Sequence, residues 1–404
     1  MQAQLCEAIK AFQLQKVSQL LADQKCPIDR AAVRYAAVSH FNRSIFEILA
    51  TFLAEQRQYL LKLARTDLVQ SQLRKLGIRH GTRILDSRAA MVVVELMGSA
   101  SIDYATARQF VPDLVFPSGG TSVYFLVGCN RDAAEILYNA GFKDVDEPDQ
   151  LMFSPLAALE VPKPSLTDYH GQYKIEDPAE ALSSYLAMCA WFHSRGALLN
   201  RVFGLAQATP LHHIAGHIGK SLVCLLDAHC KIQDGEEEET FNRRFVNDWT
   251  DVLRPLISNS IILQEIFENM EHHDLFSCPC SIGGALPLNI LLNETINAYY
   301  PINASRFRRP LIVSPLVALV VEPQEPSDLK PRLNSFNRMA SVVLRACSFA
   351  CLDLPHTCRS ASLHRYQRLQ DDKQTVDDGL NKLVRECEEK FRESGVPLSK
   401  FLID

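Results

Sequence analysis

The residues best suited to chemistry are two short pairs of metal-ligating side chains in the second half of the chain. Cys278 and Cys280 form a Cys-x-Cys pair, and His356 and Cys358 form a His-x-Cys pair. Thiolates and imidazole are the ligands that a structural zinc ion prefers, although about two to four residues usually separate the members of a pair. Four further residues of these types could replace a member of the set: Cys347, Cys351, His272 and His273. The simpler interpretation, which we favour, makes Cys278 and Cys280 buried thiols in a tight turn.

His213 and His217 are a second pair of candidate ligands, four residues apart on a predicted helix. This spacing puts both imidazoles on one helix face, where they can bind one metal ion. No glutamate stands nearby in the place of a metalloprotease general base, so we interpret both as ordinary helix residues. His212 beside them is interpreted as a structural histidine that hydrogen-bonds neighbouring backbone.

The sequence carries no catalytic signature. Ser118-Gly119-Gly120-Thr121 is glycine-rich but lacks the lysine and the spacing of a phosphate-binding loop. Cys224 and Cys358 have histidines nearby in sequence, which says nothing about their distance in the fold. We therefore predict a protein that is not an enzyme and has no cofactor, with the structural zinc described above as the alternative.

Charge and hydropathy exclude several classes of protein. The 404 residues include 42 Lys and Arg against 47 Asp and Glu, a net charge of -5, which argues against a chain-wide surface for nucleic acid. Two basic clusters, at 306–309 and 359–368, are better interpreted as solvated helix faces than as phosphate contacts or nuclear-import signals. Hydrophobic residues make up 47% of the chain, which excludes wholesale disorder.

The sequence also predicts neither export nor membrane insertion. Residues 1–12 lack the basic-then-apolar layout of a secretory signal. The longest nearly unbroken apolar run, 311–321, falls well short of the roughly 20 residues that span a bilayer. Twelve cysteines are too few for a disulfide scaffold, so we predict reduced thiols. The expected location is intracellular, cytoplasmic or nuclear, without membrane partners.

A turn motif that can position helices recurs along the chain. Its clearest copy is Thr209-Pro210-Leu211-His212, and weaker copies begin at Thr121 and Ser154. The interval from Thr121 to Ser154 equals the period of ankyrin repeats, roughly 33 residues. A candidate fourth copy, Leu286-Pro287-Leu288-Asn289, follows Thr209 at more than twice that interval. In the clearest copy, the Thr side chain can cap a helix, and Pro fits the first helical position because no N–H is needed there.

Glycines keep the same register at the ends of the predicted second helices. The interval from Gly141 to Ser154 is the same as the interval from Gly196 to Thr209. Glycine suits a helix end because it adopts the left-handed backbone at little cost. The interval from Ser154 to Gly196 is longer than this register requires, and the excess predicts a protruding loop at about 160–181.

With these motifs the chain resembles the degenerate ankyrin-repeat proteins that are numerous in filamentous fungi. The resemblance covers residues 120 to 395 and rests on five stretches: 122–146, 189–197 with Cys189-Ala190-Trp191-Phe192, the turn 208–212, 278–292 with Cys278-Pro279-Cys280-Ser281, and 349–358 with His356-Thr357-Cys358. It departs at Gly284-Ala285, where the family has a Gly-Cys pair, and this departure weakens the zinc interpretation. The resemblance implies a regulatory adaptor, with a transcriptional co-regulator that acts through a partner as one form.

The predicted fold is all-α: an irregular ankyrin-type helical repeat solenoid with long insertions and a C-terminal helix. We divide the chain into an N-terminal helical region or set of degenerate cap repeats at 1–115, a repeat region at 116–300 and a C-terminal helical region at 301–404. The repeat region carries insertions at about 160–181 and 234–280. Apolar residues at helical spacing from Val376 to Phe391 predict a helix docked on its own chain, with a partner-binding helix as the alternative.

A solenoid of this kind works by binding other proteins through its turns and helix faces. The predicted contacts are aromatic residues of the first turn and residues that surround the first helix end: Tyr124, Phe125, Phe142, Lys143, Asp144, Asp146, Glu147 and Asp149. We expect protein partners and no direct contact with nucleic acid. The competing class is an enzyme or biosynthetic accessory protein that uses the solenoid as a scaffold around a Cys/His site.

Overall fold

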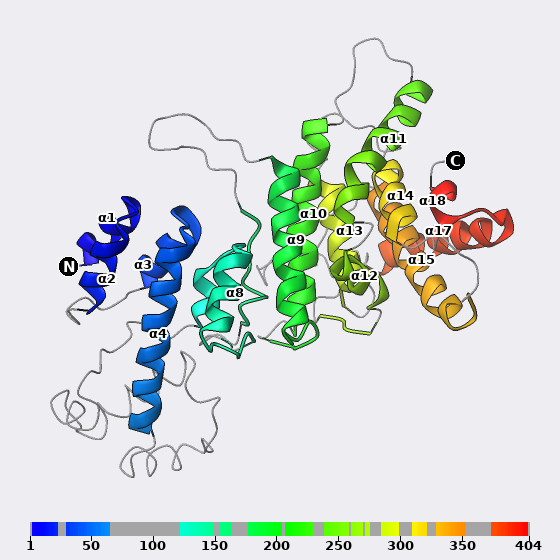
Figure 1. Ribbon diagram of the computed structural model, residues 1–404. Coiled ribbons are helices and arrows are strands. Elements are labelled where there is room, and N and C mark those ends of the chain that lie inside the picture. Colours follow the sequence, from blue (N-terminus) through cyan, green and yellow to red (C-terminus); the bar gives the residue numbers. More distant parts are fainter. Residues whose placement is uncertain are drawn as a thin grey trace. The chain divides into compact units, whose positions relative to one another are not determined.

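The regular secondary structure of the described part of the chain is all helical (Figure 1). The computed structural model describes residues 2–22, 30–64, 122–146, 148, 153–162, 177–203, 207–229, 238–257, 260–269, 271–274, 284–298, 309–320, 329–351 and 373–402. Over these ranges there is no strand, and a single isolated β-bridge joins Phe203 to Ala208. The prediction of an all-α fold is therefore confirmed at this level. Among these helices, none is both long and apolar enough to cross a membrane.

The chain divides into two compact units. Unit 1 consists of Met1–Glu160 with Ala187–Leu198, and unit 2 consists of Val161–Leu186 with Leu199–Asp404. The division falls inside helix α9 (Pro178–Ser194). The predicted boundaries at 115/116 and 300/301 lie outside the described residues.

Unit 1 is built from helices around a buried apolar interior. The helix α4 packs on α8, and Asn130, the N-cap of α8, reaches back with Nδ2 to the carbonyl oxygen of Ala37 at 2.7 Å. Ile9, Ala37 and Phe46 are fully buried in this unit. Its elements before α9 are α1 (Gln2–Lys10), α2 (Leu14–Ala22), α3 (Arg30–Arg34), the π-helical turn η1 (Tyr35–Ser39), α4 (Arg43–Ala64), the 3-10 turn η3 (Val123–Leu126) and α8 (Arg131–Asn139).

Unit 2 holds the helices that follow α9. The fully buried Trp249 of α11 donates from Nε1 to the carbonyl oxygen of Ile312 in α14 at 3.1 Å, which joins these two helices at their interface. Its elements after α9 are α10 (Pro210–His229), α11 (Glu238–Ile257), α12 (Ile261–Glu268), α13 (Pro287–Ala298), α14 (Arg309–Val320), α15 (Leu329–Cys351), α17 (Lys373–Ser394) and α18 (Leu398–Phe401).

The loop predicted at about 160–181 differs from the structure at its C-terminal end. Residues 178–181 were expected in a loop but form the first turn of α9, because Asp177 caps it: Oδ1 of Asp177 accepts from the backbone N–H of Ala179 at 3.0 Å, and Pro178 occupies the first helical position. Residues 163–176 lie outside the described part. The insertion predicted at 234–280 contains α11 and α12, which pack on α14 and α13 within unit 2.

The C-terminal helix α17 docks on its own chain. It packs on α15, and Leu380 and Val384 of its apolar face are buried. Polar bonds add to this contact, since Ser341 Oγ donates to Glu388 Oε1 at 2.5 Å. The prediction of a helix docked on its own chain is confirmed. Because α15 covers the apolar face of α17, this face is unavailable to a partner.

Candidate partner-binding surface and repeat junction

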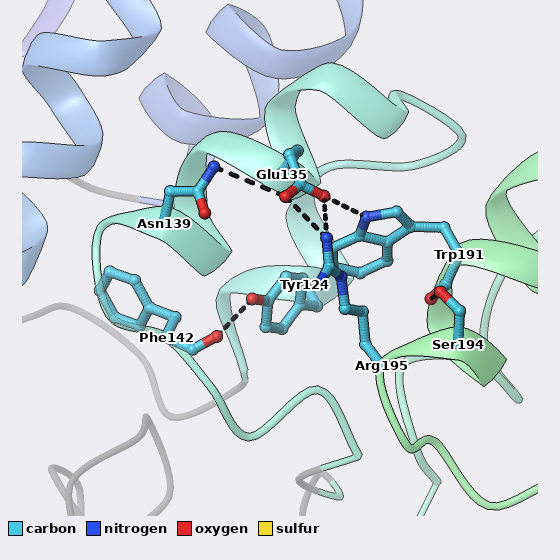
Figure 2. A network of polar contacts seen from close by, with 7 residues as sticks. All are labelled: Tyr124, Glu135, Asn139, Phe142, Trp191, Ser194 and Arg195. Carbon is cyan, nitrogen blue, oxygen red and sulfur yellow. Dashed lines mark hydrogen bonds and ion pairs between the residues drawn. The ribbon is translucent and has the colours of Figure 1, made fainter.

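The first predicted repeat turn is held from inside unit 1. Ser122 caps the turn η3, its Oγ accepting from the backbone N–H of Tyr124 at 3.5 Å. Tyr124 is only 2% exposed, and its hydroxyl donates to the carbonyl oxygen of Phe142, a residue that is 6% exposed (Figure 2). This bond joins the turn to the segment just after α8, so the Tyr124 side chain belongs to the core.

Two glycine-terminated helix ends, at α8 and α9, have the same hydrogen bonds. After α8, Gly141 has φ of +115° and donates to the carbonyl oxygen of Tyr138, while Phe142 donates to that of Leu137. After α9, Gly196 has φ of +94° and donates to His193, while Ala197 donates to Phe192. Both are Schellman motifs, in which glycine adopts the left-handed backbone and the last carbonyls are satisfied. The prediction that Gly141 and Gly196 end their helices is confirmed.

A carboxylate ties these two helix ends together within unit 1. Glu135 of α8 accepts at Oε2 from the indole Nε1 of Trp191 at 2.6 Å, and its two oxygens accept from Nη2 of Arg195 at 2.8 and 2.9 Å (Figure 2). The Trp191 hydrogen bond, assisted by Arg195, lowers the pKa of Glu135 although partial burial acts against it. Glu135 in turn raises the pKa of Arg195. The carboxylate and the guanidinium are therefore both charged at neutral pH.

Two cations stack on one aromatic ring beside this carboxylate. Nζ of Lys143 lies 3.6 Å from the ring centroid of Tyr138, and Cζ of Arg195 lies 4.4 Å from the same centroid. The Tyr138 ring also packs edge-on to the indole of Trp191, with 6.1 Å between centroids. Cation–ring contacts of this kind fix long side chains at a surface. We call Glu135, Tyr138, Lys143, Trp191 and Arg195 the Tyr138 cluster.

The predicted partner contacts divide between interior and surface. Tyr124 and Phe142 are buried, so they offer no surface to a partner, and we correct their assignment from contact to core. Lys143 is exposed, while Phe125, Asp144 and Asp146 are half-buried. Glu147 and Asp149 lie outside the described residues.

The spacing of residues in the sequence does not predict a site formed by Glu135, Tyr138, Trp191 and Arg195. Glu135 and Trp191 are 56 residues apart, and no periodicity pairs a carboxylate with an indole at that separation. A signal was nevertheless present, because Tyr138 and Arg195 each fall in the last turn before a helix-ending glycine.

A second set of matched polar contacts joins two turns of unit 2, at 209–212 and 286–289, that the sequence predicts as repeat turns; we call it the repeat junction. His212 is 2% exposed, and its Nδ1 accepts from the backbone N–H of Thr209 at 3.1 Å. Because Nδ1 accepts, Nε2 carries the proton and donates to the carbonyl oxygen of Ala285 at 2.9 Å. His212 thus bonds its own turn and also the turn that precedes α13, as predicted for a structural histidine.

The turn before α13 repeats this chemistry with asparagine. Oδ1 of Asn289 accepts from the backbone N–H of Leu286 at 3.0 Å, three residues back, as His212 accepts from Thr209. Helices α10 and α13 both begin at the proline of their turn. The backbone before each turn also corresponds, since Gln207 and Gly284 both have positive φ, at +50° and +114°.

Helices α10 and α13 run parallel and side by side (Figure 1). Their first turns are joined by the bond from His212 to Ala285, and further along, Gly219 of α10 lies against α13. A Cβ added at Gly219 would stand 2.6 Å from Cβ of Glu294 and 2.8 Å from the carbonyl oxygen of Leu291. This approach of the two helices is close enough that only glycine fits.

Burial dominates the electrostatics of the junction. Loss of hydration lowers the pKa of His212 to about 4, with His213, His272 and His273 adding smaller effects in the same direction. The bond to the Ala285 carbonyl acts the other way and is the weaker cause. At neutral pH His212 is therefore an uncharged imidazole, which fits a ring that accepts at one nitrogen and donates at the other.

No metal site was found among the described residues. Cys278, Cys280, His356 and Cys358, the predicted zinc ligands, lie outside them. The rings of His213 and His217 lie against Phe203 and Tyr185, at 5.2 and 5.9 Å between centroids. These contacts agree with their interpretation as ordinary helix residues.

Comparison with known proteins returns no match to a protein family, to a curated sequence or to a solved structure.

Proposed function

We propose that the chain is an ankyrin-type repeat scaffold that binds other proteins and acts as a regulatory adaptor, in its most specific form a transcriptional co-regulator. The observation that carries the proposal is the repeat junction of unit 2. In each of its two turns, at 209–212 and 286–289, a side chain accepts a hydrogen bond from the backbone N–H three residues back. Each turn starts one of two parallel helices, α10 and α13. Recurrent turns that start parallel neighbouring helices are what a stacked repeat requires.

Stacked repeats suit protein binding for a physical reason. Each helix pair buries its apolar face against its neighbours, which leaves the turns and helix ends to form a surface distributed over several units. Binding energy at such a surface concentrates in a few anchors, and Trp, Tyr and Arg are the residue types enriched among them. The Tyr138 cluster in unit 1 presents a tyrosine and an arginine of this kind at two neighbouring helix ends.

The test of the proposal is partner capture by the full chain, followed by reconstitution. The tagged chain is incubated with nuclear and cytoplasmic extracts of its own cells, in parallel with an unrelated helical protein of similar charge. Each selectively captured protein is then purified, and the mass of its complex with the chain is measured by light scattering. We expect at least one stoichiometric complex. A chain that forms none with any candidate contradicts the scaffold proposal, and partners that are all cytoplasmic contradict the co-regulator form.

A further inference from the structure

The Tyr138 cluster carries more positive than negative charge at a surface. Lys143 and Arg195 each bring one positive charge, and Glu135 is the one carboxylate bonded to either within the described residues. Nζ of Lys143 and Cζ of Arg195 lie 3.6 and 4.4 Å from the same ring centroid, so these two atoms are no more than about 8 Å apart. Asp144 is next to Lys143 in sequence, but among the described residues it makes no ion pair with it.

We infer that the Tyr138 cluster docks an extended acidic segment of a protein partner, in which two carboxylates are separated by one residue. This inference rests on the proposed function and names the chemistry of the partner. The carboxylates bind Lys143 and Arg195, and the intervening backbone lies along the Tyr138 ring.

Both cations have N–H donors that no carboxylate of the described residues takes. Glu135 takes Nη2 of Arg195, and the guanidinium also has a side-chain hydrogen bond with Tyr138. A guanidinium has five N–H donors, so it can bind a further carboxylate beside these partners. The ammonium of Lys143 rests on a ring that accepts no strong hydrogen bond, so its N–H donors can bind an oxygen.

Spacing allows a peptide with two carboxylates to reach both cations. In an extended chain, side chains two residues apart lie on one face, roughly 7 Å apart at about 3.3 Å per residue. Nζ of Lys143 and Cζ of Arg195 lie no more than about 8 Å apart, so two such carboxylates are within reach of both.

The cluster is also held in place before any ligand arrives. Gly141 and Gly196 fix the two helix ends, Glu135 anchors Arg195, and the Tyr138 ring orients both cations. A preorganised site loses less side-chain entropy on binding. An aromatic ring flanked by cations and a half-exposed arginine is the kind of anchor that dominates a protein interface.

The test uses the full chain and a fluorescein-labelled octapeptide of alternating Ser and Glu, with fluorescence anisotropy as the readout. The same peptide with Gln in place of Glu reports on the carboxylates. Lys143→Glu reverses the charge of the site, and Lys143→Gln removes it with less disturbance. Arg131→Glu is the matched control, because Arg131 is an exposed cation at the other end of α8, roughly 12 Å away along the helix axis.

We expect the Glu peptide to bind at least tenfold more weakly to Lys143→Glu, severalfold more weakly to Lys143→Gln and within twofold of normal to Arg131→Glu. The Gln peptide should bind far more weakly than the Glu peptide to the unaltered chain. Equal binding of the two peptides, or equal losses in Lys143→Glu and Arg131→Glu, overturns the inference. Inorganic phosphate that displaces the peptide as well as unlabelled peptide does at the same concentration also overturns it, because the site then belongs to a free anion.

The same variants separate this inference from the proposed function. A captured partner that binds the unaltered chain and Arg131→Glu but not Lys143→Glu supports both. A partner that binds all three equally leaves the scaffold standing and overturns the assignment of the Tyr138 cluster. Specific binding of the Glu peptide by a chain that forms no protein complex supports the site but contradicts the scaffold.

Discussion

Replacing His212 by Asn separates the two bonds of the repeat junction. Asn289, at the equivalent position of the turn before α13, shows that an asparagine makes the bond to its own turn. His212→Asn should therefore keep the bond to the N–H of Thr209 and lose the bond to the Ala285 carbonyl, because the shorter amide does not reach as far as Nε2. That carbonyl is not orphaned, because it still accepts from the backbone N–H of Asp274 at 3.1 Å. Loss of one such bond, with a smaller side chain in a buried site, costs about 1 to 2 kcal/mol at pH 8.

The dependence on pH is the sharper part of this prediction. The pKa of His212 is lowered to about 4 in the folded protein from 6.5, so the unfolded chain binds the extra proton first. The neutral His212 side chain contributes fully to the free energy of unfolding above pH 6.5. This contribution is lost as the pH falls toward 4, which lowers the free energy of unfolding by about 3 kcal/mol. His212→Asn has no such loss. The variant should be less stable than the unaltered protein at pH 8 and more stable near pH 4.

The assay is urea unfolding at several pH values between 8 and 4.5, followed by the fluorescence of Trp249. Trp249 is buried in unit 2, and a Trp191→Phe background removes the only other tryptophan. His40→Asn is the control, because His40 lies in unit 1 and is not among the groups that shift the pKa of His212. It should follow the unaltered protein across the range. A stability difference between His212→Asn and the unaltered chain that does not change with pH would refute the reasoning.

Four further substitutions test the packing and the helix ends. Gly219→Ala should destabilise unit 2 by about 1 to 3 kcal/mol in urea unfolding, because the added Cβ meets Cβ of Glu294 at 2.6 Å. Gly379 of α17 is exposed and an added Cβ there meets nothing within 4 Å, so Gly379→Ala should stabilise by about 0.5 to 1 kcal/mol. An equal effect at both sites contradicts the close approach of α10 and α13. A Cβ added at Gly196 also has open space around it, so the cost of Gly196→Ala, about 1 to 2 kcal/mol, should come from the positive φ alone. Hydrogen exchange of the α9 amides measures this cost, and an unchanged exchange rate would argue against a left-handed backbone at Gly196. Trp249→Phe loses an indole N–H that donates to a buried carbonyl of α14 and should cost about 1 to 3 kcal/mol in thermal or urea unfolding, with a neutral result contradicting the bond.

The predictions that held depend on local chemistry. Gly141 and Gly196 end helices because a positive φ is needed just after the last turn, and the sequence spacing alone locates that residue. Thr209 with His212 and Leu286 with Asn289 are contacts three residues apart, which one turn of chain decides. The same holds for the apolar stripe of α17, whose period already predicts a face to be covered.

The corrected assignment of Tyr124 depends on which faces meet. Tyr124 was expected at the surface because repeat turns are exposed, yet its ring is buried and its hydroxyl bonds to Phe142, 18 residues along. The corrected end of the loop predicted at about 160–181 has a local cause, because repeat spacing takes no account of the cap that Asp177 forms on Ala179.

What the amino-acid sequence determined by itself is therefore the helical class, the helix ends and the turn chemistry, since these follow from interactions within about one helical turn. Only the tertiary structure decided the contacts that join distant segments. Glu135 and Trp191 are 56 residues apart, and His212 and Ala285 are 73 apart. Such pairs depend on how whole helices pack. A polar side chain that packing buries needs a hydrogen-bond partner, whereas the same side chain at an exposed position is hydrated by water.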